Sequence, residues 1–163
     1  MLKLEDFKAA KKRVDEVILP THLIHSDAFS EECGNDVYIK PENLQKTGAF
    51  KIRGAYNKIM KLDDEAKKKG LIASSAGNHA QGVAYAAKKL GVKATICMPA
   101  HTPLIKVDAT KAHGADVVLY GEAYDEAYEK AVELQKSEGY TFVHPFDDED
   151  VMEGQGTIAL EIM

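Results

Sequence analysis

Short apolar runs alternate with longer amphipathic segments from residue 71 to residue 143. The runs predict four strands, at Leu71–Ala73, Ala94–Cys97, Asp116–Tyr120 and Thr141–Val143. The segments between them have helical spacing and extend from about His79 to Leu90, Pro103 to His113, and Glu122 to Glu138. Strands that alternate with helices of this length form right-handed βαβ crossovers and a parallel sheet. We therefore expect an α/β fold, with a four-stranded parallel sheet and helices on both faces.

The N-terminal part of the chain has a less regular pattern. Spaced apolar residues predict an amphipathic helix over Leu4–Ile18, which Pro20 ends. Ser26 is a suitable cap for a short helix that reaches Cys33, and Val37–Ile39 suits a short strand. Further helices are expected over Lys51–Lys61, from Asp63-Asp64 to Gly70, and from Val151 onward. The polar segment Glu42–Ala49 is expected to be a loop.

Composition and charge narrow the classes of function. The chain has 163 residues, of which 45% are hydrophobic and 29% charged, and a formal net charge of −5. A nucleic acid or an anionic membrane attracts a basic surface, so neither is expected as a partner. No apolar run reaches the roughly 20 residues of a membrane span, and no signal-peptide pattern is present. The widely spaced Cys33 and Cys97 favour a reduced, cytoplasmic protein.

The turn Ser75–Asn78 follows a predicted strand and precedes a predicted helix. In an open α/β sheet, ligands bind where strands end and helices begin. Free backbone N–H groups in this turn would suit a substrate carboxylate, and the Asn78 amide could bind a cofactor oxygen. A plain strand-to-helix turn with Ser75 and Asn78 as caps explains the same residues. The pattern alone leaves both interpretations open.

Lys51 lies at the junction between a glycine-containing loop and a predicted helix. A partly desolvated amine near a helix N-terminus loses its proton readily, which suits a Schiff base with an aldehyde cofactor. Most lysines at helix starts are solvated, so the position of Lys51 alone decides nothing.

Two motifs taken together resemble a known family. Thr47-Gly48-Ala49-Phe50-Lys51-Ile52-Arg53-Gly54-Ala55 and Ser75-Ala76-Gly77-Asn78-His79-Ala80-Gln81-Gly82 resemble the two signatures of the threonine/serine dehydratases. Lys40-Pro41-Glu42-Asn43-Leu44-Gln45 and Gly154-Gln155-Gly156-Thr157 extend the similarity over nearly the whole chain. These enzymes use pyridoxal 5′-phosphate and have the tryptophan-synthase-β fold, also called fold type II.

The resemblance implies a role for each matching residue. Lys51 would bind the cofactor aldehyde and remove the substrate α-proton, and Phe50 would pack beside the pyridine ring. Asn78 would bind the ring 3′-oxygen. The backbone amides of Ser75, Ala76, Gly77, Asn78 and His79 would hold the carboxylate of an amino acid substrate. Loss of the β-hydroxyl and release of ammonia would give a 2-oxo acid, which is 2-oxobutanoate for threonine.

Ala76 favours elimination over racemisation. Related serine racemases resemble this loop but carry a serine where this chain has Ala76, and that hydroxyl transfers a proton on the opposite cofactor face. A methyl group cannot transfer a proton. The cysteine synthases have the same fold, but the setting of their lysine differs from Ala49–Arg53.

Several other polar residues have plainer interpretations. A capping or packing role for the His79 side chain is favoured over proton transfer, and Arg53 is expected to pair with an acidic side chain. His101 and His113 suit loop and helix-end positions. His144–Asp148 is expected to be a turn with solvated acids, and no metal site is expected.

The resemblance also implies a domain division. Residues 1–51 would belong to a large cofactor-binding domain that is incomplete here, residues 52–148 to a small α/β domain, and residues 149–163 to the return into the large domain. The glycine-rich phosphate loop of the family would follow Met163, so weak cofactor binding is expected. Exposed apolar surface could then favour homo-oligomers. A catalytically silent folded module is the alternative to an enzyme.

Overall fold

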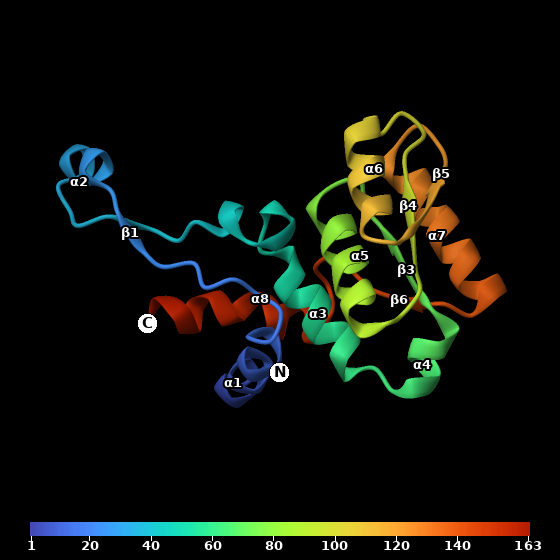
Figure 1. The fold of residues 1–163 in the computed structure, drawn as a ribbon, viewed down its shortest axis with the longest axis horizontal. Coiled ribbons are helices and arrows are strands. Elements are labelled where there is room, and N and C mark those ends of the chain that lie inside the picture. Colours follow the sequence, from blue (N-terminus) through green and yellow to red (C-terminus); the bar gives the residue numbers. More distant parts are fainter.

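The computed structural model describes residues 1–163 and has a folded body from which an extended arm projects (Figure 1). The strands are β1 (Ile24–His25), β2 (Tyr38–Ile39), β3 (Leu71–Ser74), β4 (Ala94–Met98), β5 (Asp116–Leu119) and β6 (Thr141–Phe142). The helices are α1 (Leu4–Val14), α2 (Asp27–Cys33), α3 (Lys51–Lys61), α4 (Asp64–Lys69), α5 (Asn78–Leu90), α6 (Leu104–Ala112), α7 (Tyr124–Glu138) and α8 (Glu149–Ile162). Two 3-10 turns, η1 (Glu42–Leu44) and η2 (Lys46–Gly48), occupy the predicted polar loop.

The main sheet has four parallel strands in the order β5-β4-β3-β6. Leu71 of β3 pairs with Ala94 of β4 on one side and with Thr141 of β6 on the other. The predicted parallel α/β sheet is confirmed. Since β3 is central, the turn that leaves it has a strand on each side.

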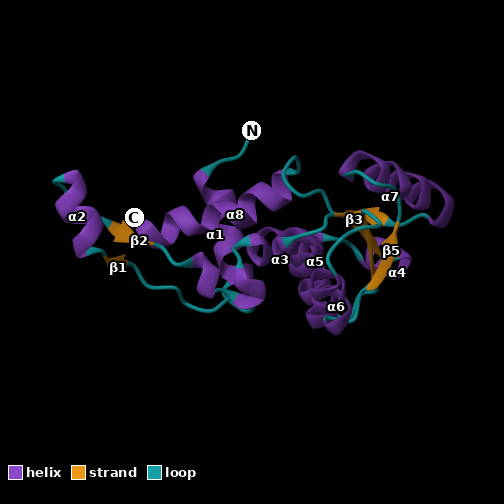
Figure 2. Cartoon of the chain, turned by 90° about the horizontal axis from the view of Figure 1, so that it is seen from above, coloured by secondary structure: helices purple, strands orange, loops and turns teal.

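Alternate residues of the central strands face opposite layers, as the pleat of a strand requires. Leu71, Ala73 and Ile96 belong to the larger apolar cluster, which includes residues of α3 and α5. Ile72 and Cys97 face the other side and pack with Ala131 of α7. Helices α5 and α6 thus cover one face and α7 the other, as Figures 1 and 2 show and as the sequence predicts.

Helix α3 packs against both α5 and α8, and α1 packs against α8 and α3. Two glycines let α3 and α8 approach closely. A side-chain carbon on Gly154 would lie 2.5 Å from the Arg53 carbonyl oxygen and 2.6 Å from the Gly54 Cα. The crossing therefore brings backbone against backbone, and it sets the position of the helix that begins at Lys51.

The arm consists of β1, α2 and β2, and it extends away from the sheet in both views (Figures 1 and 2). Strand β1 pairs antiparallel with β2, and β1 has only two residues with no alternation that the sequence could reveal. The cap of α2 is confirmed, since the Ser26 hydroxyl accepts a 3.4 Å hydrogen bond from the Phe29 N–H and Gly34 ends the helix with φ 66°. Large apolar side chains of the arm are exposed, among them Ile24, Phe29 and Tyr38.

Three predicted helix boundaries are wrong by a few residues. Helix α1 ends at Val14, because Val17 and Ile18 continue only as turns whose N–H groups bond to the Val14 carbonyl. Helix α7 starts at Tyr124 rather than Glu122. Helix α8 starts at Glu149 because the Asp148 carboxylate accepts hydrogen bonds from the N–H groups of Asp150 and Val151. No helix in the structure combines the length and the apolar character that crossing a bilayer requires.

Candidate active site

Lys51 is the first residue of α3 and is half-buried. Its Nζ donates a 2.9 Å hydrogen bond to the Pro145 carbonyl oxygen and lies 5.4 Å from the centre of the Phe50 ring. Burial lowers the pKa of the Lys51 amine from its ordinary value. Phe50 itself is 38% exposed, so its side chain is only partly covered by the rest of the chain.

The backbone of Lys51 is fixed by α5. A side-chain carbon on Gly82 would lie 3.1 Å from the Lys51 carbonyl carbon and from the Ile52 nitrogen. Only glycine allows this approach without a shift of one helix. Helix α5 also begins at the second motif, so this contact links the two motifs that the sequence singled out.

The predicted Ser75–Asn78 turn connects β3 to α5. The Ser75 N–H donates to the Cys97 carbonyl of β4 at 3.1 Å, and the Ser75 hydroxyl accepts from the Gly77 N–H at 3.2 Å. Asn78 is exposed, and a side-chain carbon at Gly77 would meet no atom within 4 Å. The turn is therefore anchored on its β4 side and open on its outer side.

Several backbone donors at this turn are free. No hydrogen-bond acceptor lies near the N–H groups of Ala76, Asn78, His79 and Ala80. Within α5, the first N–H group with an acceptor is that of Gln81, which donates to the Gly77 carbonyl oxygen at 3.4 Å. The first N–H groups of a helix carry partial positive charge and bind anions. This end of α5 can therefore hold a carboxylate. Of the two interpretations of this turn, the plain capped turn is less suitable, because neither Ser75 nor Asn78 caps α5 with its side chain.

His79 packs inward from the start of α5. Its side chain is buried, and its Nε2 lies 3.0 Å from the Val143 carbonyl oxygen. Burial lowers the pKa of His79 to about 4; the bond to Val143 opposes this shift, and the charge of Lys51 adds to it. The imidazole is thus neutral near pH 7, in line with the packing role favoured from the sequence.

The loop that follows β6 receives bonds from both motifs. Its Val143 carbonyl accepts from His79 and its Pro145 carbonyl accepts from Lys51. From the sequence, His144–Asp148 is predicted only as a turn with solvated acids. The available signal was the position of this loop, since it leaves the carboxyl end of the strand next to β3.

Arg53 pairs with acids, as expected, and its partners come from distant segments. The guanidinium is fully buried and donates to both oxygens of Glu42 at 2.8 Å. It donates to Glu161 of α8 at 2.7 and 2.9 Å and to the Thr157 hydroxyl at 3.2 Å. Arg53 holds the pKa of Glu161 down at about 2, with Lys40 contributing. No sequence pattern connects residues 42, 53 and 161, so these partners could not be predicted.

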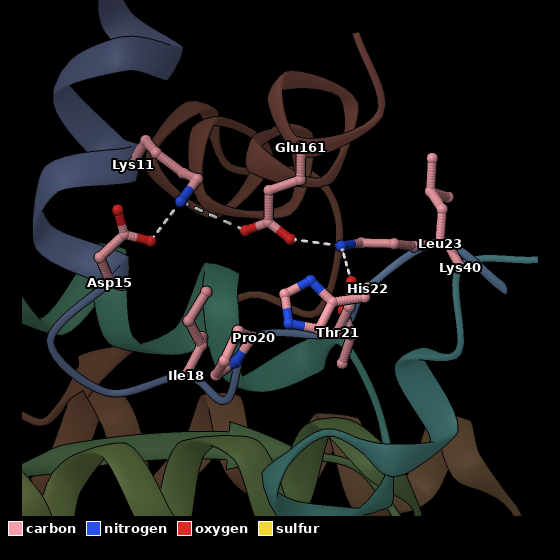
Figure 3. Close-up of a pocket in the computed structure, with 9 residues that line it drawn as sticks. All are labelled: Lys11, Asp15, Ile18, Pro20, Thr21, His22, Leu23, Lys40 and Glu161. Atoms are coloured by element: carbon pink, nitrogen blue, oxygen red, sulfur yellow. Dashed lines mark hydrogen bonds and ion pairs between the residues drawn. The ribbon is translucent and has the colours of Figure 1, made fainter.

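A cavity of about 480 Å³ lies at the root of the arm, away from the predicted site residues (Figure 3). Its lining comprises Lys11, Asp15, Ile18, Pro20, Thr21, His22, Leu23, Lys40 and Glu161. The Glu161 carboxylate reaches Lys40 at 2.7 Å and Lys11 at 3.4 Å (Figure 3). Because these charged groups are paired with one another, the cavity offers no free charge to a ligand.

The residues near Lys51 fit two parts of a pyridoxal-type cofactor with its substrate. A partly buried amine suits an aldehyde, and the free N–H groups at the start of α5 suit a carboxylate. The Ser74 hydroxyl at the end of β3 is buried without a partner, and so is His79 Nδ1. Buried polar atoms without a partner are uncommon in folded proteins, and a functional role is one reason for them.

Comparison with known proteins gives consistent matches. The family model described as pyridoxal-phosphate dependent enzyme matches residues 14–163. An L-threonine ammonia-lyase of Thermotoga maritima is 54% identical over 163 residues, which is 100% of this chain and 41% of that protein. The chain thus spans about two fifths of the length of this curated relative.

Solved structures agree over nearly the whole chain. The processed form of threonine deaminase isoform 2 from Solanum lycopersicum matches with a TM-score of 0.93 and 46% identity, over 98% of this chain and 46% of that chain. A serine racemase from Dictyostelium discoideum matches with a TM-score of 0.93 and 38% identity, over 99% of this chain and 53% of that chain.

Proposed function

The chain belongs to the family of pyridoxal-phosphate dependent enzymes, and we propose that it provides the lysine and the carboxylate-binding turn of an L-threonine ammonia-lyase. The proposed reaction converts threonine into 2-oxobutanoate and ammonia, and serine is a second candidate substrate. The 54% identity to an L-threonine ammonia-lyase supports this choice of substrate. The observation that carries the proposal is that the Lys51 amine and the His79 side chain, at the start of α5 where the backbone amides are free, both bond to one loop, residues 143–145.

The bound cofactor supplies an aldehyde that links to amines and a ring that takes up negative charge. Lys51 provides the amine for that aldehyde, and its lowered pKa increases the neutral fraction that can act as nucleophile and base. Phe50 contributes an apolar surface beside the ring. Asn78, exposed at the start of α5, has an amide free to bind the ring oxygen.

The N–H groups of Ala76, Asn78 and His79 bind the substrate carboxylate in this proposal. The N–H groups of Ser75 and Gly77, which the resemblance also assigned to the carboxylate, are already bonded to the Cys97 carbonyl and the Ser75 hydroxyl, so these two residues shape the turn instead. Fixing the carboxylate orients the Cα–H bond toward the Lys51 amine. Lys51 then accepts the α-proton, and the Cβ–O bond breaks as a Cα–Cβ double bond forms. The β-hydroxyl takes up one proton and leaves as water, so the proton taken from Cα balances the proton that water carries away. Placing reactants in this way supplies much of the rate enhancement that enzymes achieve.

Ala76 supports elimination as the outcome. The serine racemase of Dictyostelium discoideum has the same fold with a TM-score of 0.93, so the fold does not separate the two activities. The methyl group of Ala76 has no proton to donate to the face opposite Lys51. We therefore propose that a proton removed by Lys51 is not replaced from the other side.

The domain division remains part of the proposal. Residues 1–51 and 149–163 would form part of a larger cofactor-binding domain, with residues 52–148 as the small domain. The packing of α1 against α8 supports this grouping, because it joins the two terminal segments.

A second candidate is a self-associating module without turnover. The exposed apolar side chains of the arm, including Ile24, Phe29 and Tyr38, favour it. Light scattering that finds only monomers would count against this candidate.

The test of the proposed function is chemical trapping. The protein is incubated with pyridoxal phosphate, reduced with borohydride and mapped by peptide mass spectrometry. We expect the reduced cofactor to be attached to Lys51 in the wild-type protein and to be absent from this peptide in Lys51→Ala. Lys46→Ala is the matched control, because Lys46 lies in the turn before α3. In Lys46→Ala the cofactor should still be attached to Lys51.

Two results would contradict the proposal. One is a label spread over surface lysines without preference for Lys51. The other is serine or threonine binding that leaves the amides of Ala76 and Asn78 unaffected. Turnover is followed separately as 2-oxobutanoate released from threonine and pyruvate released from serine.

A further inference from the structure

The segment Ser75–His79 is bonded to β4 on one side of β3 and, on the other side, to Val143, the residue that follows β6. On the β4 side, the Ser75 N–H donates to the Cys97 carbonyl at 3.1 Å. On the β6 side, the only bond is that of the His79 side chain to the Val143 carbonyl at 3.0 Å. Val143 is itself fixed to β3, since its N–H donates to the Ile72 carbonyl at 2.9 Å.

The direction of the His79 bond assigns its tautomer. A carbonyl oxygen only accepts, so Nε2 carries the proton and Nδ1 does not. Nδ1 is buried and has no partner. The one N–H group of the neutral imidazole therefore donates to Val143, and Nδ1 carries no proton that could be transferred to a substrate.

His79 lies on the same face of α5 as Gly82, one turn further along. Gly82 contacts the backbone of Lys51, and Lys51 reaches the Pro145 carbonyl two residues beyond Val143. A closed set of contacts thus runs from α5 to α3, from α3 to the 143–145 loop, and back to α5 through His79. A break at His79 frees the start of α5 on the β6 side.

We propose that His79 is a positioning residue for the carboxylate site: its side chain ties the start of α5 to the chain after β6 and so holds the free amides of Ala76 and Asn78 in place. The inference rests on the proposed function, since it concerns the same turn. It assigns the side chain of His79 a role distinct from that of its backbone amide.

The chain offers a matched pair of variants. In His79→Gln the side-chain amide nitrogen can occupy the position of Nε2 and donate to Val143. In His79→Asn the amide is one bond shorter and ends near the position of Nδ1, so Val143 loses its donor. Both variants are polar amides, and they differ only in reach. Val107→Ala, a buried change in α6, controls for loss of stability alone.

The first measurement needs no ligand. Amide hydrogen exchange of Ser75, whose N–H is bonded to Cys97, reports on the anchoring of the turn. We expect exchange to rise by about fivefold or more in His79→Asn, as expected for the loss of one ordinary hydrogen bond. Wild-type rates are expected in His79→Gln and in Val107→Ala after correction for global stability. Equal rates in the Gln and Asn variants would overturn the proposal.

The second measurement is titration with L-threonine without cofactor, followed through the amide resonances of Ala76 and Asn78. Binding should weaken by about fivefold in His79→Asn and persist in His79→Gln. If wild type binds and both variants bind as well, the inference falls and the proposed function stands. If L-threonine causes no shift of these amide resonances in the wild-type protein, the proposed carboxylate site is wrong, and this inference is wrong as well.

Discussion

Gly82 of α5 lies directly against the backbone of Lys51, and a side-chain carbon at Gly82 would be 3.2 Å from the Lys51 carbonyl oxygen. The helix that starts at the Ser75–Asn78 turn thus also locates the start of the helix that carries Lys51. The two motifs are separate in sequence and share one rigid contact.

Gly82→Ala should disturb that contact. Overpacking costs about 1–3 kcal/mol, and the better helix propensity of alanine returns about 1 kcal/mol. We expect a net loss near 1 kcal/mol in urea unfolding and a reduced yield of borohydride trapping at Lys51. Gln81→Ala, one position earlier on the same helix, should leave trapping unchanged. Full trapping in Gly82→Ala would show that the contact does not place Lys51.

Thr47 has an unusual backbone conformation for a β-branched residue. Its φ of 64° is the only positive value outside glycine, and its hydroxyl is buried without a partner. The left-handed region costs ordinary residues about 1–2 kcal/mol, and asparagine tolerates it better. Thr47→Asn should therefore raise the free energy of unfolding by about 0.5–1 kcal/mol. Thr141→Asn, in the extended β6, should lower it, and a loss at both positions would argue against strain at Thr47.

Arg53→Met should be strongly destabilising. The substitution leaves two partly buried carboxylates, Glu42 and Glu161, without their cation, and breaking such a pair costs about 3–5 kcal/mol. Lys69→Met breaks only an exposed pair with Glu65 and should cost no more than about 1 kcal/mol. Urea unfolding of the two variants compares them directly. Similar small losses would mean that the Arg53 network does not hold α3 to α8.

The stability of the protein should fall as the pH is lowered from about 6.5 toward about 4. The folded state lowers the pKa of His79 from 6.5 to about 4, chiefly through burial, so the unfolded chain binds the proton first. The contribution of the neutral His79 side chain to the free energy of unfolding is complete above pH 6.5 and is lost as the pH falls toward about 4. Burial also lowers the pKa of His113. His79→Gln should therefore flatten this part of the stability profile, and His113→Gln should remove part of the remainder. An unchanged slope in His79→Gln would contradict the assignment.

Lys51→Met should raise the pKa of His79. Burial is the largest cause of the lowered value and remains in the variant, but the positive charge of Lys51 is removed. The pKa should therefore move upward from about 4 and stay below 6.5. Titration of the His79 ring by NMR measures it, with Lys58→Met as the control. An identical pKa in wild type and Lys51→Met would place the two side chains too far apart for one site.

Much of the sheet could be predicted from the sequence because its strands are short apolar runs separated by amphipathic helices. The bounds Lys51–Lys61 of α3 agree with prediction, since the polar loop before it and the lysine-rich end are local signals. Of the two paired strands β1 and β2, only β2 is predicted from the sequence. Ile24–His25 has two exposed residues, and its pairing with Tyr38–Ile39 depends on contacts outside the local pattern.

The candidate site also has residues that local sequence signals predict and residues that only the tertiary structure reveals. The sequence predicts Lys51 and the Ser75–Asn78 turn as site residues because each lies at a junction between a loop and a helix and within a motif that resembles the family, and their roles stay predictions. The Pro145 and Val143 carbonyls were missed because a backbone acceptor has no signature in the sequence. The ion pairs of Arg53 with Glu42 and Glu161 were anticipated only as an unspecified acid, since they join segments that meet through tertiary packing.

The pairing of β6 with β3 has a consequence for protein synthesis. A nascent chain that has emerged only to Ser137 contains β3, β4 and β5 and can form their parallel pairs, but it lacks β6 and the carbonyls of Val143 and Pro145. Lys51 and His79 then have no acceptors for their side chains. Domains fold largely from the N-terminus during translation, so the bonds of Lys51 and His79 to the loop after β6 form only after most of the sheet has been synthesised.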